Sequence, residues 1–285
     1  MTPAPFAYSR PDSLDEALAM IAVGDPSIRV LAGGQSLIPL MKLRLARPER
    51  LVDVGRLPEL RAIRDLPGGG IAIGALTTWA ALLEDPRIGA FGALADAIPV
   101  IGDVQVRNRG TIGGSLAHAD PASDIAAPAL ALQLELVARS AARGERTIAI
   151  DAFFAGPFAT VLEPDEMLVE IRVPAAARSA ASAYVALPQP ASGYPIAGVA
   201  VSLVPATGGG YSACTIGVTG VGEQPYRAVD VEAAILAGAP IQDATRTIAT
   251  GQRVAADIHA DRDYRTAMAP VMARRALAAA SARLG

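Results

Sequence analysis

The sequence has few of the side chains that bind metals or carry acid–base chemistry. Among its 285 residues there are two histidines and one cysteine. A [2Fe–2S] cluster needs about four thiolates, and a structural zinc ion about four cysteine or histidine ligands. The chain alone can supply neither, so no metal site and no internal disulfide is expected. Cys214 lies in an alternating segment, where we expect a small buried side chain.

An excess of positive charge and a long apolar run are also missing. The formal net charge of -3 and the pI near 5.5 argue against a nucleic-acid partner. No stretch reaches the roughly 18 apolar residues of a membrane span. Residues 1–6 lack the basic and then apolar organisation of a signal peptide. We therefore expect a cytoplasmic protein without a transmembrane segment, whose 52% hydrophobic content fills a core shared by two or three lobes.

Familiar catalytic and nucleotide-binding motifs are absent as well. The nearest approach to G-x-G-x-x-G is residues 220–225, where proline takes the last position, and there is no P-loop. The sequence contains no G-x-S-x-G elbow, no H-E-x-x-H and no histidine-based triad of credible spacing. No catalytic residue is therefore assigned. If the chain belongs to an enzyme, a bound cofactor supplies the reactive atoms and the protein orients it.

Two glycine pairs are the most informative feature that is present. They lie at residues 32–36 (Ala-Gly-Gly-Gln-Ser) and 111–115 (Thr-Ile-Gly-Gly-Ser). Glycine has no Cβ to clash with an anion and adopts positive φ, so consecutive amides can face one phosphate cluster. We expect both bends to hold one diphosphate through main-chain hydrogens, since no Lys or Arg lies between Ala32 and Met41. Ordinary loop turns are the alternative.

The first of three predicted parts alternates strands and helices and ends near Leu57. Ser13 and Glu16 form a capping box for its first helix, and Ser36 is expected to cap the second. Pro39 fits the first turn of that second helix. The predicted strand, helix, strand, helix and strand span residues 6–10, 13–24, 28–32, 37–47 and 50–54.

The second part begins with a hairpin at the glycines of residues 67–70, followed by a helix over 79–83 capped by Thr77 or Thr78. A longer helix over 88–100, the second glycine turn and a helix from about Asp124 come next. Three more strands are predicted at 132–139, 146–150 and 167–173.

The third part follows an Ala- and Ser-rich stretch, residues 175–183, that is typical of a linker. Three strands in a meander are predicted at 183–187, 196–204 and 211–221. Helices from Val229, Gln242 and Tyr264 close the chain, the last with an apolar face toward the core.

Three segments in this order and spacing carry a family resemblance: 32–45, Leu51-Val52-Asp53 and 109–121. They resemble the FAD-binding medium subunit of the molybdenum hydroxylases, of the carbon monoxide dehydrogenase and xanthine dehydrogenase type. The resemblance covers nearly the whole chain, including the tail at 264–275. It implies an α+β fold with a two-lobed FAD-binding domain of the vanillyl-alcohol oxidase (PCMH) type, at 1–57 and 58–174. A C-terminal domain of the carbon monoxide dehydrogenase flavoprotein type follows at 175–285, with a three-stranded antiparallel sheet and helices.

The resemblance also implies which residues contact FAD. Both glycine segments would wrap the diphosphate and ribityl chain, Asp124 would bond a polar group of the flavin, and the ring of Tyr194 would lie against the isoalloxazine. From the residues alone, Asp124 equally fits a helix N-cap, and Tyr194 a core or turn tyrosine. The implied cofactor contacts are Ala32, Gly33, Gly34, Gln35, Ser36, Leu37, Thr111, Ile112, Gly113, Gly114, Ser115, Asp124, Leu168 and Tyr194.

Two departures from the family pattern bear on the flavin. Gln35 stands where some relatives carry histidine, which keeps hydrogen bonding but removes a possible proton donor. Residues 186–190 are uncharged where other relatives have basic residues, which puts stabilisation of an anionic reduced flavin by a lysine there in doubt. For His118 we favour a hydrogen-bonded structural role over a site of covalent flavin attachment.

The function implied by the resemblance is electron relay in an oxidoreductase that is active only as a complex. FAD on this chain would take electrons from a small [2Fe–2S] subunit and pass them to an external acceptor. A large molybdopterin subunit would oxidise the substrate, within a dimer of heterotrimers, a heterohexamer. Arg107 and Arg109 are candidate docking residues, or ordinary solvated charges. Two alternatives stay open: a stand-alone FAD-dependent oxidoreductase with the same flavin lobe, and a non-catalytic nucleotide-binding module.

Overall fold

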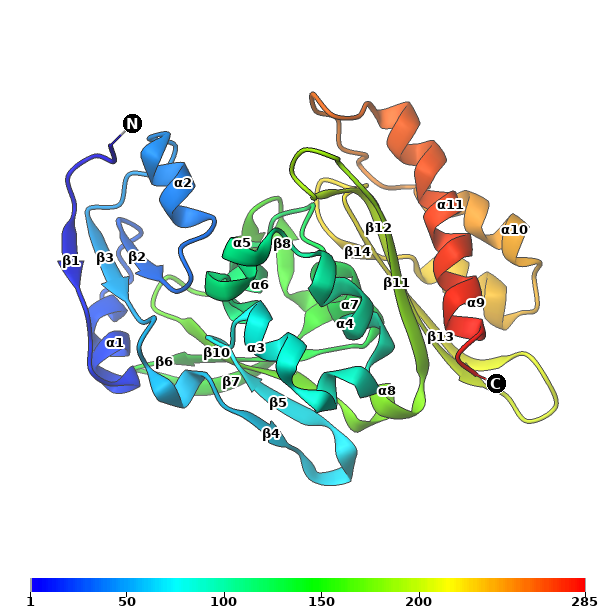
Figure 1. Cartoon of the computed structure of the whole chain (residues 1–285), viewed down its shortest axis with the longest axis horizontal. Helices are drawn as coiled ribbons and strands as arrows, with labels where there is room; N and C mark the ends of the chain where they lie inside the picture. The colour runs from blue at the N-terminus through cyan, green and yellow to red at the C-terminus, as the bar shows by residue number, and fades with distance from the viewer. Residues whose placement is uncertain (1, 285) are drawn as a thin grey trace.

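Three large sheets follow one another along the chain in the computed structural model, which describes residues 2–284. The N-terminal part lies at one end of the molecule, an antiparallel sheet covered by a layer of helices lies in the middle, and the C-terminal sheet and helices form the other end (Figure 1). This arrangement agrees with the predicted α+β class.

The N-terminal sheet is parallel, with strand order β1-β3-β2. Its elements are β1 (Ala7–Ser9), α1 (Leu14–Ile21), β2 (Ile28–Leu31), α2 (Leu37–Lys42) and β3 (Arg50–Asp53). The predicted alternation of strands and helices is therefore confirmed.

Helix α2 is shorter than the predicted helix over 37–47. Arg44 has a left-handed backbone, with φ of 61°, and the amides of Leu45 and Ala46 both donate to the carbonyl of Leu40. This closure ends the helix because a left-handed residue cannot continue it. At α1, Ser13 caps Glu16 N–H at 3.2 Å as predicted, but the Glu16 carboxylate accepts from Asp12 N–H rather than from Ser13.

The central sheet is antiparallel, with strand order β4-β5-β10-β6-β7. The predicted glycine hairpin joins its first two strands through a 3-10 turn. The elements are η1 (Pro58–Leu60), β4 (Ile63–Asp65), η2 (Pro67–Gly69), β5 (Ile71–Gly74), β6 (Glu135–Ser140), β7 (Gly144–Ala149) and β10 (Met167–Val173). A small hairpin of β8 (Phe154–Gly156) and β9 (Ala159–Thr160) follows η5 (Ile150–Ala152).

Short helices form a layer over this sheet (Figure 1). They are α3 (Trp79–Glu84), η3 (Pro86–Ala90), α4 (Gly92–Ala97), η4 (Ile98–Val100), α5 (Val104–Arg109), α6 (Ile112–His118) and α7 (Ala126–Ala131). Thr78 caps α3 by accepting from Ala81 N–H, as predicted. The single helix expected over 88–100 is wrong: Phe91 leaves the helical region with φ of -118° and ψ of 83°, and its buried ring separates η3 from α4.

The C-terminal part departs from prediction at two points. The expected linker is instead α8 (Ala175–Ser179) followed at once by β11 (Ala181–Pro188). The antiparallel sheet has a short fourth strand beyond the three predicted, in the order β11-β12-β13-β14, with β12 (Pro195–Pro205), β13 (Tyr211–Thr219) and β14 (Tyr226–Arg227). The closing helices are α9 (Val229–Leu236), α10 (Ile241–Ala244), η6 (Thr245–Thr247) and α11 (Arg262–Ser281).

Buried side chains tie neighbouring parts together. On the central sheet, Val137 and Val169 pack toward α1 and β3, whereas Leu136 and Ile171 pack under the helical layer. The helical-layer core also takes in Tyr184 from β11, and α11 covers the opposite face of the C-terminal sheet.

Candidate functional site

The first glycine segment lies where β2 ends and the chain turns into α2. Gly33 is buried against the backbone that ends α5: an added Cβ would overlap the Arg109 carbonyl and lie 2.9 Å from Cα of Gly110. Gly34 has a left-handed backbone with φ of 77°. Both positions therefore require glycine, the first for close approach and the second for its conformation.

The amides of this segment are free. Ile38 N–H donates to the Gly34 carbonyl at 3.0 Å and begins the helical hydrogen bonds. Among the hydrogen bonds of residues 2–284, none uses an amide N–H of the five residues from Gly33 to Leu37. Ser36 occupies the N-cap position of α2, but the predicted cap is wrong, because its backbone is already in the αR region and its side chain makes no capping bond. Four of these five residues are buried or half-buried, where backbone amides are normally paired, so the segment offers consecutive donors to a ligand.

The second glycine segment is the first turn of α6 and not a separate turn. Thr111 caps this helix by accepting from Gly114 N–H at 3.2 Å. The amides of Ile112 and Gly113 donate to the carbonyls of Thr77 and Ala75 at 3.1 and 3.0 Å. These amides are therefore already satisfied inside the protein, in contrast to those of residues 33–37.

The backbone of α6 lies too close to neighbouring segments for side chains at its two glycines. A Cβ on Gly113 would lie 2.5 Å from the Ala75 Cβ, and one on Gly114 would lie 3.6 Å from the Ala32 Cβ. The second contact joins the two segments directly. The structure thus brings both glycine pairs together, although they lie almost eighty residues apart in sequence.

Asp124 is buried beside this junction, with only 7% of its surface exposed. The hydroxyl of Tyr184 in β11 donates to Asp124 Oδ1 at 2.7 Å, a contact between the central and C-terminal parts. Burial raises the pKa of Asp124 to about 7, although the Tyr184 hydrogen bond works against the shift. The N-cap interpretation is wrong, since the residue before α7 is Ile125 and no side chain caps that helix.

Tyr194 lies in the loop between β11 and β12, with 46% of its surface exposed. The Gln189 side chain shapes this loop by accepting from the amides of Ala191 and Ser192 at 2.7 and 2.6 Å, and Gln189 N–H donates to the Tyr194 carbonyl. Burial, followed by the negative charges of Asp120 and Asp124, raises the pKa of Tyr194. Tyr194 and Asp124 therefore share one electrostatic environment.

The remaining residues expected to contact FAD lie partly at the surface and partly in the core. Gln35 is exposed, and Ser36 and Leu37 are half-buried. The Ser115 hydroxyl lies 3.0 Å from that of Ser123, beside Asp124. Leu168 does not join them: it is buried in β10 within the core beneath the helical layer.

His118 at the end of α6 is half-buried against Phe158, with ring centroids 5.3 Å apart. Burial has the largest effect on the pKa of His118 and lowers it. The charge of Asp120 raises this pKa, and that of Arg29 lowers it. The packed ring agrees with a structural role, but the expected hydrogen bond is not found: the His118 side chain makes none with any residue from 2 to 284.

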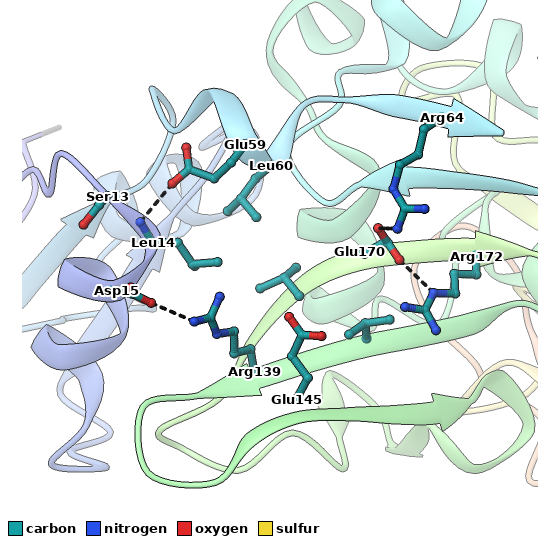
Figure 2. Close-up of a pocket in the computed structure, with 12 residues that line it drawn as sticks. Ser13, Leu14, Asp15, Glu59, Leu60, Arg64, Arg139, Glu145, Glu170 and Arg172 are labelled. Carbon is teal, nitrogen blue, oxygen red and sulfur yellow. Dashed lines mark hydrogen bonds and ion pairs between the residues drawn. The ribbon is translucent and has the colours of Figure 1, made fainter. Parts of the chain in front are cut away.

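A cavity of about 440 Å³ lies apart from these residues, between α1 and the central sheet. Figure 2 shows that its charged side chains face one another: Arg139 pairs with Asp15 at 2.8 Å, and Glu170 lies between Arg64 and Arg172. No expected site residue lines it. All of its arginines are in ion pairs, and the cavity lies between the N-terminal part and the central sheet, apart from the glycine segments.

Two known protein families together match nearly the whole chain. The family described as FAD binding domain in molybdopterin dehydrogenase matches residues 4–176, and the CO dehydrogenase flavoprotein C-terminal domain matches residues 182–280. The chain is 40% identical over 288 residues to the carbon monoxide dehydrogenase medium chain of Hydrogenophaga pseudoflava, covering 99% of each chain. It is 35% identical to the glyceraldehyde dehydrogenase medium chain of Sulfolobus acidocaldarius, over 93% of this chain and 92% of the relative.

A solved structure agrees with these sequence matches. Carbon monoxide dehydrogenase from Hydrogenophaga pseudoflava, in a form lacking the Mo-pyranopterin moiety of its molybdenum cofactor, contains a chain that superimposes with a TM-score of 0.93. The two chains are 42% identical in that comparison, and each is covered over 99% of its length.

Proposed function

This chain belongs to the FAD-binding medium subunits of the molybdenum hydroxylases, and on that premise we propose that it holds FAD between its two glycine segments. The family resemblance and the α+β fold predicted from the sequence are confirmed. The chain is a flavoprotein subunit of an oxidoreductase, with an electron-transfer role and FAD as its cofactor.

The unpaired amides of Gly33 to Leu37 are the observation that carries this proposal. A diphosphate has many acceptor oxygens, and hydrogen bonds from backbone N–H groups to an anion are stronger than those to neutral acceptors. The glycines leave the space that a Cβ would fill, and Gly114 brings α6 up to Ala32. The residues present therefore fit a dinucleotide diphosphate held by main chain rather than by lysine or arginine.

We propose different tasks for the two segments. Residues 33–37 donate hydrogen bonds to the diphosphate, because their amides are free. In α6 the amides of the first turn are already paired, so this segment contributes in other ways. The Gly113 and Gly114 backbone allows close packing, and the Ser115 hydroxyl faces the ligand. Leu168, one of the fourteen expected contacts, would not touch the cofactor and would only pack in the core beneath α6.

The flavin ring belongs, in this proposal, at the end of the site formed by Asp124 and Tyr194. Bound FAD supplies the redox chemistry, since a flavin exchanges electrons singly or in pairs. The Tyr194 ring would cover one face and limit access of water. Asp124, with a pKa of about 7, can hold or release a proton close to neutral pH at Oδ2, while Tyr184 occupies Oδ1.

Partner chains complete the proposed relay. Related proteins are named as medium chains or as subunits of a dehydrogenase complex. For this chain we propose a small [2Fe–2S] subunit and a large molybdopterin subunit, assembled as a dimer of heterotrimers. Cys214 is the single cysteine and is buried, so the cluster must be held by another chain.

Arg109 is the better of the two docking candidates. Arg107 donates to the carbonyls of Ile101 and Gly102 at 3.1 and 2.8 Å, so its head group is committed. Arg109 is exposed and makes no ion pair with any residue from 2 to 284. It also ends α5 beside Gly33, so a partner bound there would lie close to the cofactor.

The proposal places the complex in the cytoplasm, which the unpaired cysteine favours. Within residues 2–284, no helix combines the length and apolar character required to cross a bilayer.

Isolation of the native complex tests the function. The expected result is a bound flavin that is released as FAD, with iron and molybdenum in fixed proportion to this chain, and reduction of the flavin only when the partner chains and their substrate are present. A purified chain that turns over a small molecule by itself would instead establish a self-sufficient flavoenzyme. A chain that never binds flavin would contradict both.

A further inference from the structure

Arg265 is a buried arginine in the second turn of α11, with 3% of its surface exposed. One terminal nitrogen, Nη1, donates to the carbonyl of Ile196 at 2.8 Å and to the carbonyl of Gly220. The other, Nη2, pairs with Asp257 Oδ2 at 2.6 Å. A single side chain thus holds the start of β12, the end of β13 and the loop before α11.

Those carbonyls belong to segments that border the site. Ile196 comes two residues after Tyr194. Gly220 N–H donates to the Pro121 carbonyl at 2.8 Å, and Gly220 packs so closely on Pro195 that an added Cβ would overlap the Pro195 carbonyl. The Tyr194 loop and residues 121–124 therefore meet at Gly220, where Arg265 binds.

Thr219 reinforces the same junction. Its hydroxyl lies 2.8 Å from the Pro121 carbonyl and 2.9 Å from the Ser123 carbonyl, next to Asp124. The loop from 189 to 194, which carries Tyr194, makes fewer hydrogen bonds to other segments. Most of its hydrogen bonds join residues of the loop itself. The Arg265 bond to Ile196 ties the start of β12, two residues after Tyr194, to the C-terminal helix.

Arg265 also retains an unmet hydrogen bond. Its Nε is the one buried side-chain nitrogen or oxygen without a partner in the part of the chain from 2 to 284. Buried donors are normally paired, so the unpaired Nε is an exception, tolerated while the two terminal nitrogens of the same side chain bind two carbonyls and a carboxylate. The planar fork of the arginine head group reaches both carbonyls and Asp257 at once, which the single ammonium group of a lysine would not reproduce.

We propose that Arg265 is a positioning residue that sets the Tyr194 ring against the flavin. It does so by fixing Ile196 relative to Gly220 and hence to residues 121–124. This inference rests on the proposed function, because it requires FAD at the site. It concerns the ring end of the cofactor and not the diphosphate, which residues 33–37 hold in a different part of the chain.

Flavin fluorescence of the FAD-loaded full chain tests this role, since a tyrosine ring stacked on a flavin quenches its emission. We expect weak emission from the unmodified chain and from Arg275→Met, a matched control at an exposed position on the same helix. Tyr194→Ala should emit more strongly. Arg265→Met should emit nearly as strongly as Tyr194→Ala, with FAD affinity reduced less than tenfold, a limit of about 1.4 kcal/mol.

The double variant separates positioning from general destabilisation. If Arg265 acts through Tyr194, the emission of Arg265→Met/Tyr194→Ala equals that of Tyr194→Ala alone. Additive increases, or wild-type quenching in Arg265→Met, would overturn the inference. If Arg265→Met does not fold, Arg265→Lys serves instead: a lysine reaches one carbonyl, so emission should rise to an intermediate level, and unchanged emission would refute the role. An unmodified chain that binds no FAD would contradict the proposed function itself.

Discussion

Substitution of Gly33 by alanine is the most direct perturbation of the proposed diphosphate site. The added methyl would overlap the Arg109 carbonyl and lie 2.8 Å from its carbon and 2.9 Å from Cα of Gly110, whereas ordinary contacts of a Cβ begin at 3.4 Å. All of these atoms are backbone, so no side chain can rotate away. The loop before α2 and the end of α5 must therefore separate.

The size of the effect follows from this forced separation. Overpacking of a tight contact costs about 1–3 kcal/mol, which corresponds to a factor of about 5 to 150 in a dissociation constant. In the apoprotein the two segments can move apart and relieve the clash. In our account FAD binds only when the two segments are together, so most of the overpacking free energy should appear as a weaker FAD affinity.

Titration of the apoprotein with FAD, followed by calorimetry or by flavin emission, measures the change. Gly89→Ala is the matched control, because a Cβ at Gly89 meets no atom within 4 Å and its φ is not positive. The control should bind FAD like the unmodified chain. Equal FAD affinity for Gly33→Ala, with the fold intact by circular dichroism, would refute the reasoning.

Three further predictions concern buried ionisable groups. For Asp124, the folded pKa of about 7 lies above the ordinary 3.8, so the apoprotein should lose stability as pH rises between these values, by at most about 4 kcal/mol. Asp124→Asn should remove that slope in urea unfolding followed across the same range, and an unchanged slope would contradict the assignment. Burial alone would raise the pKa of Glu166, but two hydrogen bonds of 2.7 Å from Arg146 outweigh it and hold the pKa below 4.5. Glu166→Gln should therefore lower the free energy of unfolding by about 1–3 kcal/mol at neutral pH, with the deficit shrinking below pH 4.5; a deficit independent of pH would be inconsistent with an ionised Glu166. Burial raises the pKa of the Cys214 thiol to about 12, so a thiol reagent should modify it only after unfolding, and rapid labelling of the folded chain would show that the thiol is accessible.

Local signals in the sequence were enough to predict most elements. The Ser13 and Thr78 caps, and the glycines between β4 and β5, act within a few residues of where they occur. Their effects do not depend on the rest of the fold, so the alternation in the N-terminal sheet and the central hairpin were predicted correctly. The two glycine segments were recognised for the same reason.

Contacts between distant segments could not be predicted. The amides of Ile112 and Gly113 bond to Thr77 and Ala75, so the sequence alone could not show that α6 uses the donors expected to face a ligand. Likewise Phe91 breaks the expected long helix because its ring is buried in the core.

Tyr184 and Arg265 were missed for a related reason. In the sequence, each lies in a strand or helix with the apolar pattern of a core element. Each acts through a partner at least 45 residues away, Asp124 for the tyrosine and Gly220 for the arginine. A polar residue within an apolar strand or helix was the only available signal. Such a residue predicts a buried hydrogen bond but does not identify its partner.

A structure of the chain with FAD bound is the measurement that tests the central claim most directly. Our account predicts diphosphate oxygens within hydrogen-bond distance of amide N–H groups between Gly33 and Leu37, with Gly114 and Ser115 close by and no lysine or arginine head group in contact. A diphosphate bound elsewhere, or gripped by basic side chains while these amides remain free, would contradict it.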